Sequence, residues 1–99
     1  MSNASETLAR LLASEIRGDL LVLFHRNPGL IDTLDGVARR IGRTAATIEQ
    51  DVNDLINLGV LKTRVFGKSQ ALLLDRERDR EILETVAAHI KDTREGETL

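Results

Sequence analysis

The side chains that most often carry out catalysis are scarce in this 99-residue sequence. Cysteine is absent, which excludes disulfides, thiolate metal sites and thiol nucleophiles. The only histidines, His25 and His89, fit surface or partly packed helix positions better than a ligand set, and the sequence holds no glycine-rich phosphate loop, H-E-x-x-H or G-x-S-x-G string. We therefore expect no enzymatic activity, no cofactor and no metal site.

Hydrogen bonding to a partner is the chemistry that the sequence does offer, between residues 44 and 58. Ile48, Val52 and Leu55 recur at helical spacing and are expected to face the core. The outward positions are then Ala46, Thr47, Gln50 and Asn53. Carboxamides such as Gln50 and Asn53 can pair bidentately with adenine, and small or methyl-bearing side chains can contact a thymine methyl group. A merely solvated helix surface fits the same residues equally well.

Basic residues flank this segment although the chain carries a net charge of −2. Arg43 precedes it, where a phosphate would also meet the backbone N–H groups of a helix N-terminus. The stretch 37–68 holds six basic and three acidic residues, and so carries +3, although extending it back to Asp32 lowers this to +1. The asymmetry is compatible with an anionic partner.

The acidic residues of the same segment favour the opposite conclusion. Residues 44–58 contain no Lys or Arg and carry Glu49, Asp51 and Asp54, which DNA phosphates would repel. An acidic helix of this kind is what a protein-binding module would present. Asp51 would not approach DNA if it lies at the edge of the core face and pairs with Arg39 or Arg40.

The elements that position these side chains follow from the apolar spacing. Residues 8–24 repeat apolar positions every three or four residues, which predicts either one long helix or a short arm followed by a helix from Ser14 or Glu15. The Asn27-Pro28-Gly29 cluster ends it. Residues 30–31 provide at most one rung of a sheet.

Two further helices and a hairpin follow. Thr33 and Thr44 are predicted N-caps of helices that end at Gly42 and Gly59. Residues 61–66 and 70–74 flank Gly67-Lys68-Ser69, which predicts a β-hairpin. A charged helix with an apolar stripe over residues 82–90 is predicted from Asp75 onward.

Residues 34–61, LDGVARRIGRTAATIEQDVNDLINLGVL, resemble the central pattern of the winged helix-turn-helix superfamily of transcription regulators. Val37-Ala38 matches the first motif helix, Gly42 the turn, and Thr44 the cap of the recognition helix, while residues 58–61 match the entry to the wing. About residues 15–75 are covered, and no subfamily is identifiable. The resemblance implies an α+β, mainly helical fold: a tri-helical core with a two- to three-stranded β-wing, plus N- and C-terminal helices.

The resemblance also implies a function. The recognition helix, about residues 44–58, would lie in the DNA major groove, with the wing, about residues 61–74, on the DNA backbone. Arg64 and Lys68 would contact phosphate or the minor groove, although charged residues also commonly protect strand edges. The expected DNA-binding residues are Arg43, Thr44, Ala46, Thr47, Gln50, Asn53, Arg64 and Lys68. A winged-helix protein–protein interaction module with no DNA role is the alternative, because fold alone does not decide function.

The remaining expectations concern the ends of the chain. Residues 1–13 are expected to form an N-terminal arm or helix extension, residues 14–91 the domain, and residues 92–99 a frayed tail. Apolar residues of the arm exceed what one core needs: Leu8, Leu11, Leu12 and Ile16. Packing them on Ile82, Val86 and Ile90 of a second chain would form a homodimer, and the alternative is an arm that folds back on its own domain. We expect a cytoplasmic protein without a membrane span, because no apolar run is long enough and no signal sequence is evident.

Overall fold

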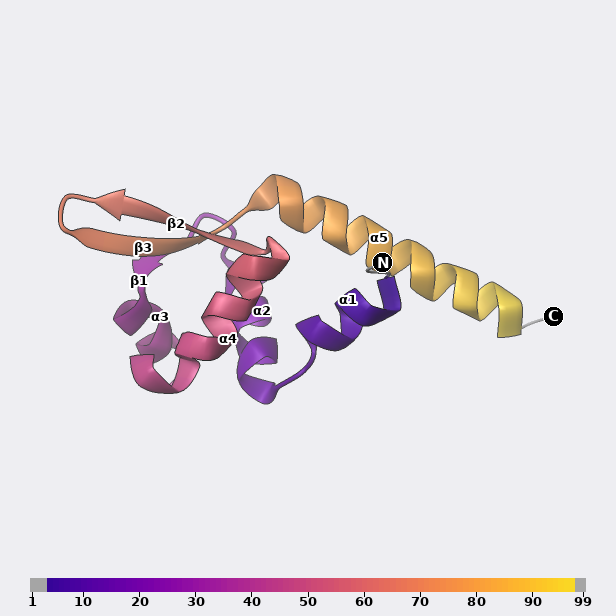
Figure 1. Ribbon diagram of the computed structural model, residues 1–99, viewed down its shortest axis with the longest axis horizontal. Coiled ribbons are helices and arrows are strands. Elements are labelled where there is room, and N and C mark those ends of the chain that lie inside the picture. The colour runs from indigo at the N-terminus through magenta and orange to yellow at the C-terminus, as the bar shows by residue number, and fades with distance from the viewer. Residues whose placement is uncertain (1–3, 98–99) are drawn as a thin grey trace.

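Five helices and one antiparallel sheet make up residues 4–97, which the computed structural model describes, with side chains described through Lys91. In chain order the elements are α1 (Ala4–Leu11), α2 (Glu15–Arg26), β1 (Ile31–Thr33), α3 (Leu34–Arg40), α4 (Ala45–Leu58), β2 (Leu61–Phe66), β3 (Ser69–Leu74) and α5 (Arg76–Glu97). This confirms the predicted order of helix, short strand, two helices, hairpin and final helix (Figure 1).

The break between α1 and α2 decides between the two predicted arrangements of the N-terminal region. The chain leaves the helix after Leu11 and starts again at Glu15, so a short helix precedes the longer one. Ser14 is the N-cap of α2, and its hydroxyl accepts a hydrogen bond from the backbone N–H of Arg17 at 3.0 Å. Residues 1–3 of the predicted arm lie outside the described residues.

The core is aliphatic around a single aromatic ring. Phe24 and Leu20 of α2, Val37 of α3, and Ile48 and Leu55 of α4 are fully buried, each with 0% exposure. The predicted core face of α4 is thereby confirmed. Burying these side chains is what holds the three helices together, since each contributes about 1.5–3 kcal/mol relative to an exposed position.

An N-cap and two glycines set the ends of helices α3 and α4. The hydroxyl of Thr33 accepts from the N–H of Gly36 at 3.1 Å and starts α3. Gly42 has a φ of +69° in the turn between α3 and α4, and Gly59 has a φ of +91° at the end of α4. A residue with a Cβ is strained at such angles, so both predicted helix ends are explained by their glycines.

The sheet has the strand order β1-β3-β2, and all its pairings are antiparallel. The pairing of Phe66 with Ser69 leaves only Gly67 and Lys68 in the hairpin turn, one residue fewer than predicted. Gly67 has a φ of +59°, and a glycine at the first turn position is typical of a two-residue type II′ turn. The hairpin projects from the helical body as a wing (Figure 1).

The C-terminal helix α5 extends to the side opposite the wing (Figure 1). Its 22 residues span about 33 Å at 1.5 Å per residue. The helix continues to Glu97, beyond the last residue of the predicted apolar stripe, and the frayed tail over residues 92–99 stays a prediction; residues 98–99 lie outside the described residues. Helix α1 packs along α5 of the same chain, which is the fold-back arrangement of the arm.

Candidate nucleic-acid interface

The outward face of α4 carries the polar side chains that the sequence assigns to it. Ala46, Thr47, Gln50 and Asn53 are all exposed. Thr44 precedes the helix with an extended backbone, as an N-cap residue does, but its hydroxyl makes no capping bond. The hydroxyls of Thr44 and Thr47 lie 2.8 Å apart instead and bond to each other.

A shallow groove of about 140 Å³ separates α4 from the sheet. It is lined by Leu34, Glu49, Val52, Asn53, Ile56, Thr63, Gln70 and Leu72. Asn53 therefore faces the wing across this groove, and Gln70 of β3 adds a second carboxamide to it. The sequence analysis did not identify Gln70 or Thr63, because strand register decides which wing residues turn toward α4.

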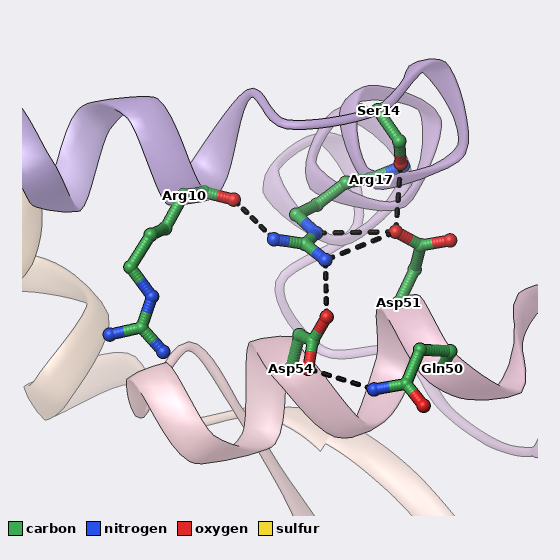
Figure 2. Close-up of polar contacts among 6 residues, drawn as sticks. All are labelled: Arg10, Ser14, Arg17, Gln50, Asp51 and Asp54. Atoms are coloured by element: carbon green, nitrogen blue, oxygen red, sulfur yellow. Dashed lines mark hydrogen bonds and ion pairs between the residues drawn. The ribbon is translucent and has the colours of Figure 1, made fainter.

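Two of the three acidic residues of α4 point away from this face, toward α2 (Figure 2). The Arg17 guanidinium contacts Asp51 Oδ1 through Nε at 3.3 Å and Nη2 at 3.2 Å, and its Nη2 donates to Asp54 Oδ2 at 2.5 Å. The Ser14 hydroxyl donates to the same Asp51 oxygen at 2.7 Å. Only Glu49 remains as an acidic residue on the exposed and wing-facing side of the helix.

Arg17 is the residue that the sequence analysis missed, and it corrects one prediction. Asp51 pairs with Arg17, not with Arg39 or Arg40; Arg40 instead binds Asp32 at 3.0 Å. The Arg17 side chain is 9% exposed. A sequence signal for this existed, because Arg17 shares a helix face with the buried Leu20 and Phe24, and a buried cation requires anionic partners.

Arg43 is directed toward α2 and not into open solvent. Its Nη2 lies 3.2 Å from Asp19 Oδ2 and 3.9 Å from Glu15 Oε1. The side chain is 28% exposed, and its Nε is buried without a hydrogen-bond partner. Arg43 thus ties the turn before α4 to α2, behind the outward face.

The wing carries its basic side chains in the open. Lys62, Arg64 and Lys68 are exposed, and the Arg64 guanidinium lies 6.0 Å from the centroid of the Phe66 ring. Alternation along β2 places Lys62, Arg64 and Phe66 on one face of the strand and Thr63 on the other, toward α4. Arg64 is therefore available to an anion, whereas Arg43 is engaged by carboxylates.

Asp32, beside the start of α3, is held in its charged form. Its carboxylate accepts from Arg40 Nε at 3.0 Å and from the backbone N–H of Thr33 at 2.8 Å. These two donors lower the pKa of Asp32 below its ordinary value, the Arg40 hydrogen bond most strongly. The pair fixes the junction between β1 and α3, next to the helix-turn-helix unit.

Several solved structures are similar to this chain over most of its length. An ArsR family transcriptional regulator matches with 15% sequence identity and a TM-score of 0.72, over 98% of this chain and 99% of its own. The winged helix-turn-helix DNA-binding domain of a possible ArsR-family regulator from Mycobacterium bovis, a homodimer, matches at 17% identity and a TM-score of 0.60, over 92% of this chain and 85% of its own.

The chain has the winged helix-turn-helix fold. A possible transcriptional regulator for arsenical resistance is also similar, at 20% identity and a TM-score of 0.65, over 88% of this chain and 82% of its own. No protein-family model and no curated protein matches the sequence. In the winged helix, α3 and α4 are the two motif helices and β2–β3 is the wing, as the resemblance of residues 34–61 predicted.

Among the described residues, neither a cluster of metal ligands nor a membrane-spanning helix is present. Through Lys91, no three His, Asp or Glu side chains gather in a way that would hold a metal ion. Among the helices within residues 4–97, none has the length and apolar character needed to cross a bilayer.

Proposed function

We propose that this winged helix is a sequence-specific DNA-binding transcription regulator, with α4 in the major groove and the wing on the DNA backbone. The observation that carries the proposal is the orientation of the acidic residues of α4. Asp51 and Asp54 are bound to Arg17 on the α2 side, so the exposed face presents Gln50 and Asn53 with little opposing charge. The main argument for a protein partner was the acidity of this helix; Arg17 neutralises one of its negative charges and holds two of its three carboxylates on the α2 side.

The exposed residues then divide into two roles. Gln50, Asn53, Ala46 and Thr47 are placed to reach base edges, with Thr44 at the helix start near the phosphates. Arg64 and Lys68 on the wing are placed to contact phosphates or the minor groove. Arg43 supports the turn through its bond to Asp19 and acts on DNA binding through the position of α4.

We further propose that the regulator is a homodimer. Leu12, in the turn after α1, is 62% exposed, and Leu83 and Ile90 of α5 are 45% and 44% exposed. An apolar groove of about 370 Å³ runs between these helices and is lined mainly by Leu8, Leu11, Leu12, Leu21, Leu83 and Val86. Since α1 already packs on α5 of its own chain, the interface would be the side of this helix pair that the packing leaves open, in an isologous contact.

Two features support the dimer: the exposed apolar side chains of Leu12, Leu83 and Ile90, and the homodimeric state of the Mycobacterium bovis domain, whose fold this chain shares. Two half-sites would also compensate for the few basic residues on each protomer. DNA binding implies residence in the compartment that holds the DNA, the cytoplasm in a cell without a nucleus.

The function is tested by selecting the DNA duplexes that the protein binds from a random-sequence pool. The affinity for a selected duplex is then measured by fluorescence anisotropy at increasing salt concentration. We expect an enriched sequence, affinity that falls steeply with salt, and much weaker binding to a scrambled duplex. An Arg80→Ala variant, which removes an exposed basic residue of α5 outside the residues proposed to contact DNA, is the control and should keep the wild-type salt slope. Absence of salt-dependent binding would reject the DNA role and leave the protein-interaction module.

The dimer is tested by light scattering at micromolar concentration. We expect about twice the 11.0 kDa chain mass for the wild type and a monomer for Leu83→Glu. Val65→Glu is the matched control, because Val65 is 68% exposed but lies on the wing, and it should stay dimeric. A wild-type mass near 11.0 kDa would reject the dimer.

A further inference from the structure

A continuous set of polar contacts joins the end of α1 to the exposed face of α4, through Arg17 (Figure 2). The Arg17 Nη1 donates to the backbone carbonyl of Arg10, in the last turn of α1. Its Nη2 donates to Asp54 Oδ2 at 2.5 Å, and the other oxygen of Asp54 accepts from Gln50 Nε2 at 3.0 Å. One guanidinium and one carboxylate therefore separate α1 from Gln50.

The geometry makes this set specific to arginine. The planar guanidinium contacts three acceptors from two helices at once: the Arg10 carbonyl, Asp51 and Asp54. A lysine ammonium, a single point at the end of a flexible stem, cannot hold acceptors on both helices with the same fixed directions. Since the side chain of Arg17 is only 9% exposed, water does not easily replace these hydrogen bonds.

We propose that Arg17 is a positioning residue that couples the docking of α1 to the base-reading side chain Gln50. Asp54 transmits the position of Arg17, because its two oxygens bind Arg17 and Gln50 separately. Asn53 lies on the same exposed face but in the groove toward the wing, outside this set of contacts. The docking of α1, which lies at the proposed dimer interface, would thereby influence how α4 reads a sequence.

The coupling is first tested without DNA, by NMR of the side-chain amide groups in the full-length protein. We expect Arg17→Lys to shift the Gln50 amide signals and to leave those of Asn53 in place. Leu8→Ala, which loosens α1 at a half-buried contact, should shift the Gln50 signals in the wild-type background but no further in the Arg17→Lys background. Gln50 signals that stay in place in both single variants would overturn the proposal.

The consequence for recognition rests on the proposed function and is tested by double-mutant cycles on the ratio of specific to non-specific DNA affinity. Arg17→Lys and Gln50→Ala should be non-additive by about fivefold or more. Arg17→Lys and Asn53→Ala form the control cycle and should be additive. Additivity in both cycles would overturn the coupling, whereas absence of DNA binding would reject only the proposed function and leave the NMR result intact.

A second variant covers the case in which Arg17→Lys does not fold. Asp54→Ala removes the link to Gln50 while Arg17 keeps its bonds to Asp51 and to the Arg10 carbonyl. We expect a folded dimer in which Leu8→Ala no longer affects the Gln50 amide signals. A Leu8→Ala shift that persists in the Asp54→Ala background would show that α1 reaches Gln50 by another route and would overturn the assignment to Arg17.

Discussion

Arginines serve the two sides of α4 in opposite ways. On the side toward α2, Arg17 is buried and its guanidinium is occupied by Asp51, Asp54 and a backbone carbonyl. On the wing, Arg64 is exposed, and its guanidinium lies over the Phe66 ring, 6.0 Å from the ring centroid. Burial and partners thus assign one arginine to holding α4 in place and leave the other accessible to a ligand. Residue type alone does not make this distinction.

The comparison also explains why the charge of a helix is a poor guide to its partner. Counted along the sequence, α4 has three acidic residues and no basic one. Counted by where the side chains lie, two of the three are satisfied from within the protein. The electrostatic field on the outward face depends on the second count, because Arg17 offsets one of the two charges and holds both carboxylates on the α2 side.

The largest expected effect is on stability, from Arg17→Met. The variant leaves Asp51 and Asp54 without their cation, and breaking a buried ion pair in this way costs about 3 kcal/mol in free energy of unfolding. Urea unfolding at one fixed protein concentration measures it. Arg64→Met is the control, since an exposed side chain on the wing should change the stability by less than about 0.5 kcal/mol. Equal values for the two variants would remove the distinction between the buried and the exposed arginine.

The next effect concerns sequence preference. Gln50→Ala and Asn53→Ala should each weaken binding to the preferred DNA site by about 1–3 kcal/mol and leave binding to unrelated DNA nearly unchanged. Competition anisotropy with the selected and a scrambled duplex gives both values. If the two duplexes lose affinity equally, these side chains do not read bases.

A smaller and uniform effect is expected from the wing. Lys68→Ala and Arg64→Ala should weaken binding to all sequences and lower the salt slope by about one unit each. Arg43→Ala is the informative contrast, because its guanidinium is bound to Asp19 and is expected to affect unfolding more than the salt slope. If Arg43→Ala instead lowered the salt slope of DNA binding by a full unit, Arg43 would contact a phosphate, as the sequence suggested.

Most of the fold was predictable because its signals are local. Apolar spacing predicts the helices, and the glycines at 42, 59 and 67 mark the places where the backbone turns with a positive φ. The differences are also local and small: the hairpin turn is one residue shorter, and α5 extends beyond the apolar stripe, to Glu97. The wing register cannot be read from strand alternation alone, so the role of Gln70 in the groove needed the structure.

The site was less predictable because its contacts join distant parts of the chain. Arg17 and Asp54 are 37 positions apart, and nothing in either segment alone selects the other as its partner. The sequence offered Arg39 or Arg40 as a possible partner of Asp51, but the packing of α2 against α4 brings Arg17 to it instead. Arg43 likewise is bound by α2, which precedes the motif. Sequence patterns placed the exposed face correctly and could not identify what holds it.

The smallest expected effect tests a third arginine, intermediate between the buried and the free one. Arg40 is 50% exposed and binds Asp32, whose pKa is lowered by that hydrogen bond and by the N–H of Thr33. Because the folded state favours the charged carboxylate, the pair stabilises the protein fully above the ordinary pKa of aspartate. The contribution is lost as the pH falls through the lowered pKa of the folded state.

Urea unfolding of the wild type and Asp32→Asn, from neutral pH downward, measures this contribution. At neutral pH their free energies of unfolding should differ by less than about 1 kcal/mol, since the pair is partly solvated. That difference should shrink on acidification. Asp35→Asn removes an exposed charge from the first turn of α3 and controls for net charge. A wild-type advantage over Asp32→Asn that grew as the pH fell would contradict the lowered pKa, and with it the view that even a half-exposed arginine fixes the β1–α3 junction.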